Sequence, residues 1–237
     1  MGAKLFTPSI LQEPSRVPTG FAEIDAVTGG LPRGELTEIY GPVSSGRTSV
    51  GISVLAQRTA QGEICAWVDA GDGFDPRTAQ NIGVTLHRLL WVRCRDLEQA
   101  IQTTDLILAS AGFGLVVLDL GSVPLRSLHR LPLSFWFRFR RAVEHTPTLL
   151  LVLAPEACAK SCTRLCLRLR LEEGSWLVIP ETKPVSHSHL LGGLHLNAEV
   201  TRSRFERPSR MRLRTKIIYR ARRGGFTPPF YSHVLKA

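Results

Sequence analysis

The sequence predicts an α/β fold in which a mostly parallel central sheet carries helices on both faces and continues into an antiparallel C-terminal extension. Three observations predict it. Short, continuously apolar runs alternate with helical stretches as far as residue 155. A glycine-rich loop follows the first of these runs and precedes a helix. Beyond Thr163, apolar residues alternate with arginine, which is typical of antiparallel strands with one solvated face.

The elements of the parallel part follow in alternation. Continuous apolar runs predict strands over residues 36–41, 64–70, 89–94, 115–121 and 148–155. The stretches between them predict helices over residues 46–60, from near residue 75, 96–111 and 134–145. In the last helix, Phe135, Phe139 and Ala142 form the expected core-facing stripe. Trp136 and Phe137 lie off this stripe, and they either contact a partner protein or cover another element.

The expected antiparallel strands comprise residues 164–172, 195–204 and 211–219. A single core domain over residues 21–223 is expected, with an extended lead-in over 1–20 and a Pro/Gly-rich tail over 224–237. No apolar run reaches the ~18 residues of a membrane span, and the first residues show no signal-peptide pattern. The five cysteines are an odd number and do not indicate a disulfide framework. A reducing cytoplasm is therefore the expected location.

Positive charge is concentrated in the second half of the chain. Residues 1–130 carry 11 basic and 13 acidic residues, whereas residues 131–237 carry 19 basic and 7 acidic residues. Arginine, the side chain best suited to bidentate phosphate contacts, supplies 25 of the 30 basic residues. This distribution favours nucleic acid as a partner, bound without sequence preference and in a salt-sensitive manner. The candidate DNA-binding residues are Arg202, Arg204, Arg210, Arg212, Arg214 and Lys216. The alternative is a solvated strand face.

The glycine-rich loop has the spacing of a phosphate-binding loop, with a strand before it and a helix after it. Arg47 stands where the loop normally has lysine, and Thr48 is the expected Mg²⁺ ligand. Asp119, at the end of an apolar run, is the second candidate for nucleotide-bound Mg²⁺. The alternative is a glycine turn that binds no nucleotide. The candidate ATP-binding residues of the loop are Gly41, Pro42, Val43, Ser44, Ser45, Gly46, Arg47 and Thr48.

Three segments carry a resemblance to a known family. VPTGFAEIDAVTGGLPRGELTEIYGPVSSGRTS (17–49), CAWVDAGDGFDP (65–76) and LVVLDLGSVPL (115–125) resemble the ATPase core of the RecA recombinases, a likeness that extends over residues ~17–220. DLGSVPL (119–125), LLLVLAP (149–155) and LLGGLHLNAEVTRSR (190–204) resemble its shortened, diverged ImuA-type relatives. The resemblance implies a bacterial cytoplasmic, nucleoid-associated protein of the SOS DNA-damage response, and a partner that is a translesion polymerase subunit or RecA.

Several family positions are altered. The glutamate that orients the attacking water corresponds to Gly71, and the adjacent Asp72 is only a weak catalytic candidate. The amide side chain that senses the γ-phosphate corresponds to Ala154-Pro155. Asp75 matches the aspartate on the adenine side, whereas the stacking tyrosine is replaced by Thr78. Because transition-state stabilisation needs these groups jointly, ATP hydrolysis is expected to be very slow or absent.

The two DNA-binding loops of the family, expected at 122–133 and 156–162, are short here. We therefore expect a non-recombinogenic accessory protein that binds DNA and supports an error-prone polymerase. The alternatives are a slow DNA-dependent ATPase using Arg47 and Asp72, and a module that modulates RecA filaments. Small buried apolar roles are favoured over metal or redox chemistry for Cys158, Cys162 and Cys166.

Overall fold

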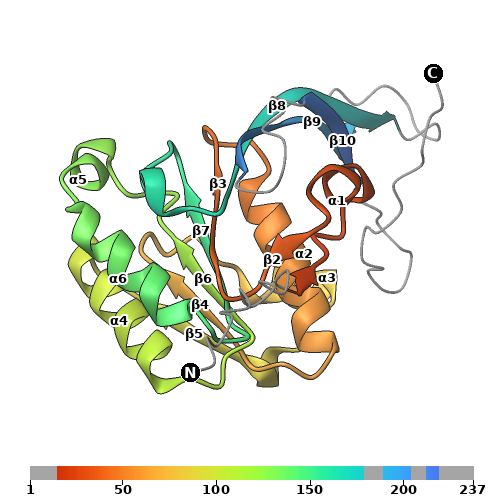
Figure 1. Cartoon of the computed structure of the whole chain (residues 1–237). Coiled ribbons are helices and arrows are strands. Elements are labelled where there is room, and N and C mark those ends of the chain that lie inside the picture. Colours follow the sequence, from red (N-terminus) through yellow and green to blue (C-terminus); the bar gives the residue numbers. More distant parts are fainter. Residues whose placement is uncertain (1–14, 179–188, 204–211, 219–237) are drawn as a thin grey trace, which may run out of the picture.

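A computed structural model describes residues 15–178, 189–203 and 212–218. Within these residues the main sheet has eight strands in the order β10-β9-β8-β3-β7-β6-β4-β5 (Figure 1). The parallel strands are β3 (Leu36–Tyr40), β4 (Cys65–Asp69), β5 (Leu89–Arg93), β6 (Leu115–Asp119) and β7 (Leu149–Ala154), and β8 (Leu165–Val178) joins β3 in parallel. The strands β9 (His189–Ser203) and β10 (Arg212–Ile218) continue the sheet antiparallel. The predicted fold class is confirmed.

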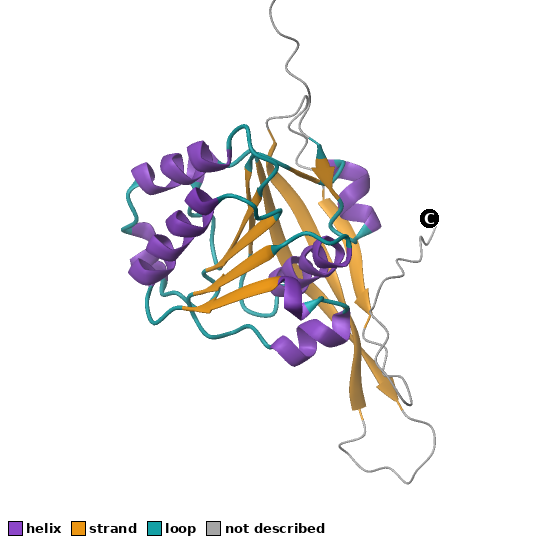
Figure 2. Ribbon diagram, turned by 90° about the horizontal axis from the view of Figure 1, so that it is seen from below, coloured by secondary structure: helices purple, strands orange, loops and turns teal. Residues whose placement is uncertain are grey.

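Helices cover both faces of the parallel part (Figures 1 and 2). The helices α1 (Ala22–Thr28), α2 (Arg47–Ala60) and α3 (Pro76–Ile82) lie on one face, and α4 (Leu97–Ser110), α5 (Leu125–His129) and α6 (Leu133–Val143) lie on the other. Each face has its own apolar cluster. Strands β4, β6 and β7 are buried along their whole length, which explains their continuously apolar sequences.

The buried stripe of α6 differs from the expected one. Trp136, Phe139 and Val143 are buried, whereas Phe135 is only partly buried and Phe137 is 46% exposed. The expected stripe of Phe135, Phe139 and Ala142 does face the core, since Phe139 is fully buried and the other two are partly buried against the same cluster, but Trp136 and Val143 widen it. Trp136 packs against the sheet, so of its two predicted roles, a partner contact or the covering of another element, the second is confirmed.

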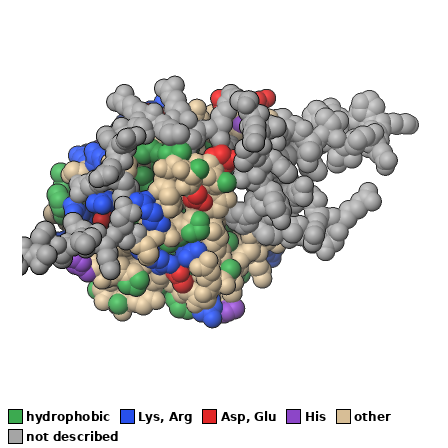
Figure 3. All heavy atoms as spheres, turned by 45° about the vertical axis from the view of Figure 1, so that its right-hand side comes forward, with side chains coloured by type: hydrophobic (Ala, Val, Ile, Leu, Met, Phe, Trp, Pro, Cys, Tyr) green, Lys and Arg blue, Asp and Glu red, His purple; other side chains and the backbone are tan. Residues whose placement is uncertain are grey.

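The antiparallel extension is apolar on one side. Leu165, Leu167 and Leu169 of β8 lie in the same apolar cluster as Leu196 and Ala198 of β9, and α1 packs against β10. Basic and acidic side chains are interspersed on the part of the surface visible in Figure 3. No helix among residues 15–178, 189–203 and 212–218 is both long and apolar enough to span a bilayer.

Short elements complete the described fold. A two-stranded antiparallel sheet joins β1 (Arg16–Val17) to β2 (Leu31–Pro32), and two 3₁₀ turns, η1 (Leu86–Arg88) and η2 (Lys160–Cys162), precede β5 and β8. Strand β9 begins six residues before the segment predicted from residue 195. The expected tail over 224–237 and most of the lead-in lie outside the described residues.

Candidate nucleotide site

The glycine-rich loop connects β3 to α2, as predicted. Ser44 and Gly46 have left-handed backbone conformations, with φ of 64° and 84°. A Cβ at Gly41 would lie 2.2 Å from the carbonyl oxygen of Leu169, so only glycine fits there. The loop ends at the first turn of α2, where backbone amides have no intrahelical acceptor and the helix dipole favours an anion.

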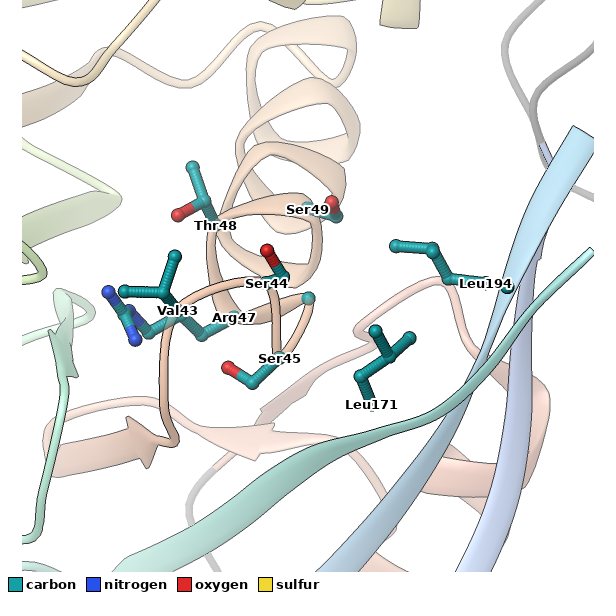
Figure 4. Close-up of a pocket in the computed structure, with 10 residues that line it drawn as sticks. Val43, Ser44, Ser45, Arg47, Thr48, Ser49, Leu171 and Leu194 are labelled. Atoms are coloured by element: carbon teal, nitrogen blue, oxygen red, sulfur yellow. The ribbon is translucent and has the colours of Figure 1, made fainter. Parts of the chain in front are cut away.

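A cavity of about 580 Å³ opens beside this loop (Figure 4). The loop side is formed by residues 43–49, and Leu171, Gly174 and Leu194 of β8 and β9 form the opposite side. The hydroxyl of Ser45 is buried without a hydrogen-bond partner among the described residues. The free amides of the helix start and this hydroxyl suit a phosphate group. Of the candidate residues, Gly41, Pro42, Asp75 and Asp119 do not line the cavity.

Arg47 is tied to backbone carbonyls. Its guanidinium donates to the carbonyl oxygen of Gly41, to that of Pro42 at 2.9 Å and to that of Gly121 at 2.9 Å. Figure 4 shows the guanidinium on the far side of the loop from Leu171 and Leu194. The side chain is buried, and this burial lowers the pKa of Arg47, while nearby Asp119 opposes the shift. Arg47 therefore joins the loop to the segment after β6.

Asp119 ends β6 and is buried. Burial raises its pKa to about 6, and the charge of Asp69 acts in the same direction. The amide of Gly121 donates to its Oδ1 at 2.9 Å, and this bond and Arg47 favour the carboxylate. Among the described residues no group of three or more side chains could hold a metal ion alone. Thr48 and Asp119 could thus hold Mg²⁺ only together with nucleotide phosphates.

The position of the family's catalytic glutamate leaves no space for a side chain. A Cβ at Gly71 would lie 2.4 Å from the Cβ and 2.7 Å from the Oγ of Ser122. Asp72, the weak catalytic candidate, has a φ of 53° and pairs through both carboxylate oxygens with Arg93, at 2.6 and 2.5 Å. This pairing lowers the pKa of Asp72. The carboxylate is engaged at the exposed end of β5 and does not line the cavity.

Two further aspartates stabilise the backbone. Asp75 is the N-cap of α3, where its carboxylate accepts from the amides of Arg77 and Thr78. The hydroxyl of Thr78 also donates to this carboxylate, and this bond, together with the amide of Thr78, lowers the pKa of Asp75. The sequence analysis gave Asp69 no role. It is buried, and it accepts from the amides of Gly71, Gly73 and Phe74. In the sequence, its place directly after an apolar strand and before a glycine-containing turn indicated that its carboxylate could accept from the amides of that turn.

A buried carboxylate on β3 also escaped the sequence analysis. Glu38 Oε1 accepts from the amides of Cys158 and Ala159, at 2.7 and 3.1 Å, and the thiols of Cys158 and Cys166 lie 3.2 and 3.5 Å from its two oxygens. Burial raises the pKa of Cys166 to about 12 and that of Cys158 further, so both thiols remain donors. In the sequence, its place as the glutamate within the apolar run LTEIY indicated a buried carboxylate that needs hydrogen-bond donors.

The expected buried role of Cys158, Cys162 and Cys166 is confirmed, since all three are buried. Of the candidate DNA-binding residues, Arg202 is the second-last residue of β9 and donates to the carbonyl oxygen of Lys160. Arg212, Arg214 and Lys216 lie on β10, paired with Glu199, Asn197 and His195. Arg204 and Arg210 lie outside the described residues.

Comparison with known proteins assigns the N-terminal half. Residues 10–125 match the model of the RecA N-terminal domain. Over 105 residues the chain is 41% identical to RecA of Cutibacterium acnes and 43% identical to RecA of Methylococcus capsulatus. This part of the chain is thus similar to the N-terminal domain of RecA. Each of these matches covers 44% of the chain and 30% of the relative's length.

A solved structure extends the likeness in fold beyond the N-terminal half of the chain. The crystal structure of the RadB recombinase matches with a TM-score of 0.62 at 20% identity, covering 89% of this chain and 98% of that one. The sequence identity to RecA thus applies to less than half of the chain, while the shared architecture includes strands beyond that half.

Proposed function

We propose that this protein is a diverged RecA-like accessory factor of DNA damage tolerance in the bacterial cytoplasm. It binds DNA without sequence preference at the nucleoid and supports an error-prone translesion polymerase, as its ImuA-type resemblance implies. Its loop binds ATP with Mg²⁺ but turns it over very slowly or not at all. The observation that carries the proposal is the contact between Gly71 and Ser122, which fills the position of the catalytic glutamate.

The nucleotide site favours binding over turnover. The loop conformation, the start of α2 and the unpartnered Ser45 hydroxyl supply donors for phosphate oxygens. Hydrolysis additionally needs a group that orients water, and Asp72 is held by Arg93 while the end of β7 carries Ala154 and Pro155. Bound nucleotide then acts as a structural ligand of the domain.

The first experiment measures fluorescent ATP binding and ATP turnover in the same samples, with and without single-stranded DNA. Binding without turnover is the expected result. DNA-stimulated turnover would overturn the assignment as a non-hydrolysing protein and would favour the slow ATPase. Absence of binding would show that the loop is not a nucleotide site, and the DNA-related part of the proposal would then rest on the basic strands alone.

The polymerase role is tested in cells. Deletion of the gene is expected to reduce ultraviolet-induced mutagenesis while homologous recombination between marked chromosomal loci stays at the wild-type level. Complementation with the chain should restore mutagenesis. Loss of recombination in the deletion strain would contradict an accessory role. A changed rate of DNA-dependent ATP hydrolysis by purified RecA on adding the chain would instead favour a modulator of RecA filaments.

A further inference from the structure

The described DNA-binding candidates lie on β9 and β10, at the edge of the sheet. The next strand, β8, carries two arginines that are not among these candidates. Arg168 and Arg170 lie on β8 between Leu167, Leu169 and Leu171. Leu167 and Leu169 are buried in the apolar cluster on the α1–α2 side of the sheet. Because side chains alternate along a strand, both arginines project from the opposite side.

That side of the extension continues across neighbouring strands. Arg168 pairs with Glu199 and Arg170 with Asn197 on β9, while β10 places Arg212 opposite Glu199 and Arg214 opposite Asn197. Directly opposed residues of antiparallel strands share a face. Cys166 is paired with Arg202 in the same ladder. We call the set Arg168, Arg170 and Arg202, with the register positions of Arg212 and Arg214, the arginine surface.

Two features indicate that this surface is free to bind. On this side of the sheet α4 packs against β4 and β6, and α6 packs against β3. Arg170 is exposed and Arg168 half-buried, and neither has an ion-pair partner among the described residues. Glu173 and Glu199 are the acidic residues paired within the β8–β9 ladder, and Arg168, Arg170 and Arg202 outnumber them, so positive charge remains in excess there.

The spacing suits a DNA backbone. Arg168 and Arg170 are two residues apart, about 7 Å along the strand, and the next row of arginine positions is two strands away, about 10 Å. Tyr40 of β3, the register partner of Arg168, is an aromatic neighbour of the surface and is partly buried against the apolar cluster of that face. The described members of the surface itself are arginines, whereas single-strand binders usually stack successive bases on several aromatic side chains. This chemistry favours the phosphates of duplex DNA.

We propose that the arginine surface is the duplex-DNA-binding face of the protein and that Arg168 and Arg170 each contact a phosphate. The inference rests on one part of the proposed function, namely that the protein binds DNA. It locates the binding face on the sheet extension, whereas the family resemblance points to the loop over residues 122–133.

The test measures binding of a duplex of about 25 base pairs by fluorescence anisotropy between about 50 and 200 mM salt. The double variant R168Q/R170Q is expected to weaken binding at least tenfold at the lower salt and to make the log–log salt slope shallower by about 2. R168K/R170K keeps the charges and is expected to keep the slope. R77Q/R95Q removes two exposed arginines from elsewhere and is expected to bind like wild type.

Other outcomes separate the alternatives. Loss of binding by R126Q/R130Q, with R168Q/R170Q unchanged, would overturn the proposal in favour of the 122–133 loop. If R168Q/R170Q weakens binding only to single-stranded DNA of the same sequence and not to the duplex, the assignment to duplex DNA would be overturned. Failure of the wild-type protein to bind DNA at the lower salt would instead refute DNA binding in the proposed function. Thermal denaturation of each variant verifies that it is folded.

Discussion

At the residue scale, Ser122 gives a steric reason for glycine at position 71, which the family resemblance matches to the catalytic glutamate. Ser122 follows β6 and places its Cβ where the first carbon of any side chain at position 71 would lie. Reintroducing a carboxylate at this position therefore requires a second change at Ser122. The two positions are expected to act as a coupled pair.

The variant G71A is expected to lower the free energy of unfolding by about 1–3 kcal/mol, because its Cβ overlaps Ser122. Adding S122G should recover most of that loss. Urea denaturation of the two single variants and the double variant measures the coupling energy. Strictly additive effects would show that the overlap relaxes elsewhere and that Ser122 does not exclude a side chain at position 71.

Asp119 makes stability depend on pH in a predictable direction. Its folded pKa of about 6 lies above the ordinary aspartate value of 3.8. Its contribution to stability is therefore fully present below about pH 4 and is lost as the pH rises through about 6. D119N does not titrate. Between about pH 5 and 7.5, the wild-type protein is expected to lose about 1 kcal/mol of unfolding free energy relative to D119N. Urea denaturation at both pH values checks this, and an unchanged difference would contradict a raised pKa.

At the scale of elements, Glu38 links β3 to the segment that returns from β7 to β8. Its carboxylate satisfies two amides of that segment and lies against two thiols. The same strand leads directly into the nucleotide loop through Tyr40 and Gly41. Strand β3 therefore positions both the glycine-rich loop and the segment between β7 and β8.

E38A is expected to destabilise the protein by about 2–4 kcal/mol, because two buried amides lose their acceptor. E38Q keeps one carbonyl oxygen and should cost less. Hydrogen exchange resolved by residue should show faster exchange at Cys158 and Ala159 in E38A, with the amides of α2 as the internal control. Equal protection of both amides in E38A and wild type would contradict this role of Glu38.

The elements also show which sequence patterns are informative. Mostly apolar runs are typical of parallel strands, so β3 to β7 and the helices α2, α3, α4 and α6 were predicted, whereas the short helix α5 was not. The stripe of α6 was predicted too narrow because FWFRF offers aromatic residues on several faces, and packing against the sheet buries Trp136 more fully than Phe135. Glycine spacing predicted the loop, but not that Arg47 would donate to the carbonyl of Gly121, 74 residues away in sequence.

At the scale of the whole molecule, the charge asymmetry predicted from composition maps onto the sheet extension. Arg168 and Arg170 were missed because their run was interpreted only as a strand. The ladder that aligns them with β10 depends on the register of β8 against β9, which shifts at three places that local sequence does not reveal. The sequence thus predicts the nucleotide loop well. Contacts between distant segments, such as those of Glu38, Gly71 and Arg47, follow only from the assembled sheet.

The position of β3 has a consequence for how the chain is made. Its partners are β7, where Leu36 pairs with Leu150, and β8, where Thr37 pairs with Leu165. During synthesis, more than a hundred further residues must therefore be added after β3 before β7 or β8 can pair with it. Contacts of such separation are slow to form, and the waiting apolar strand is prone to aggregation. The nucleotide loop is thus among the last parts of this protein to acquire its shape.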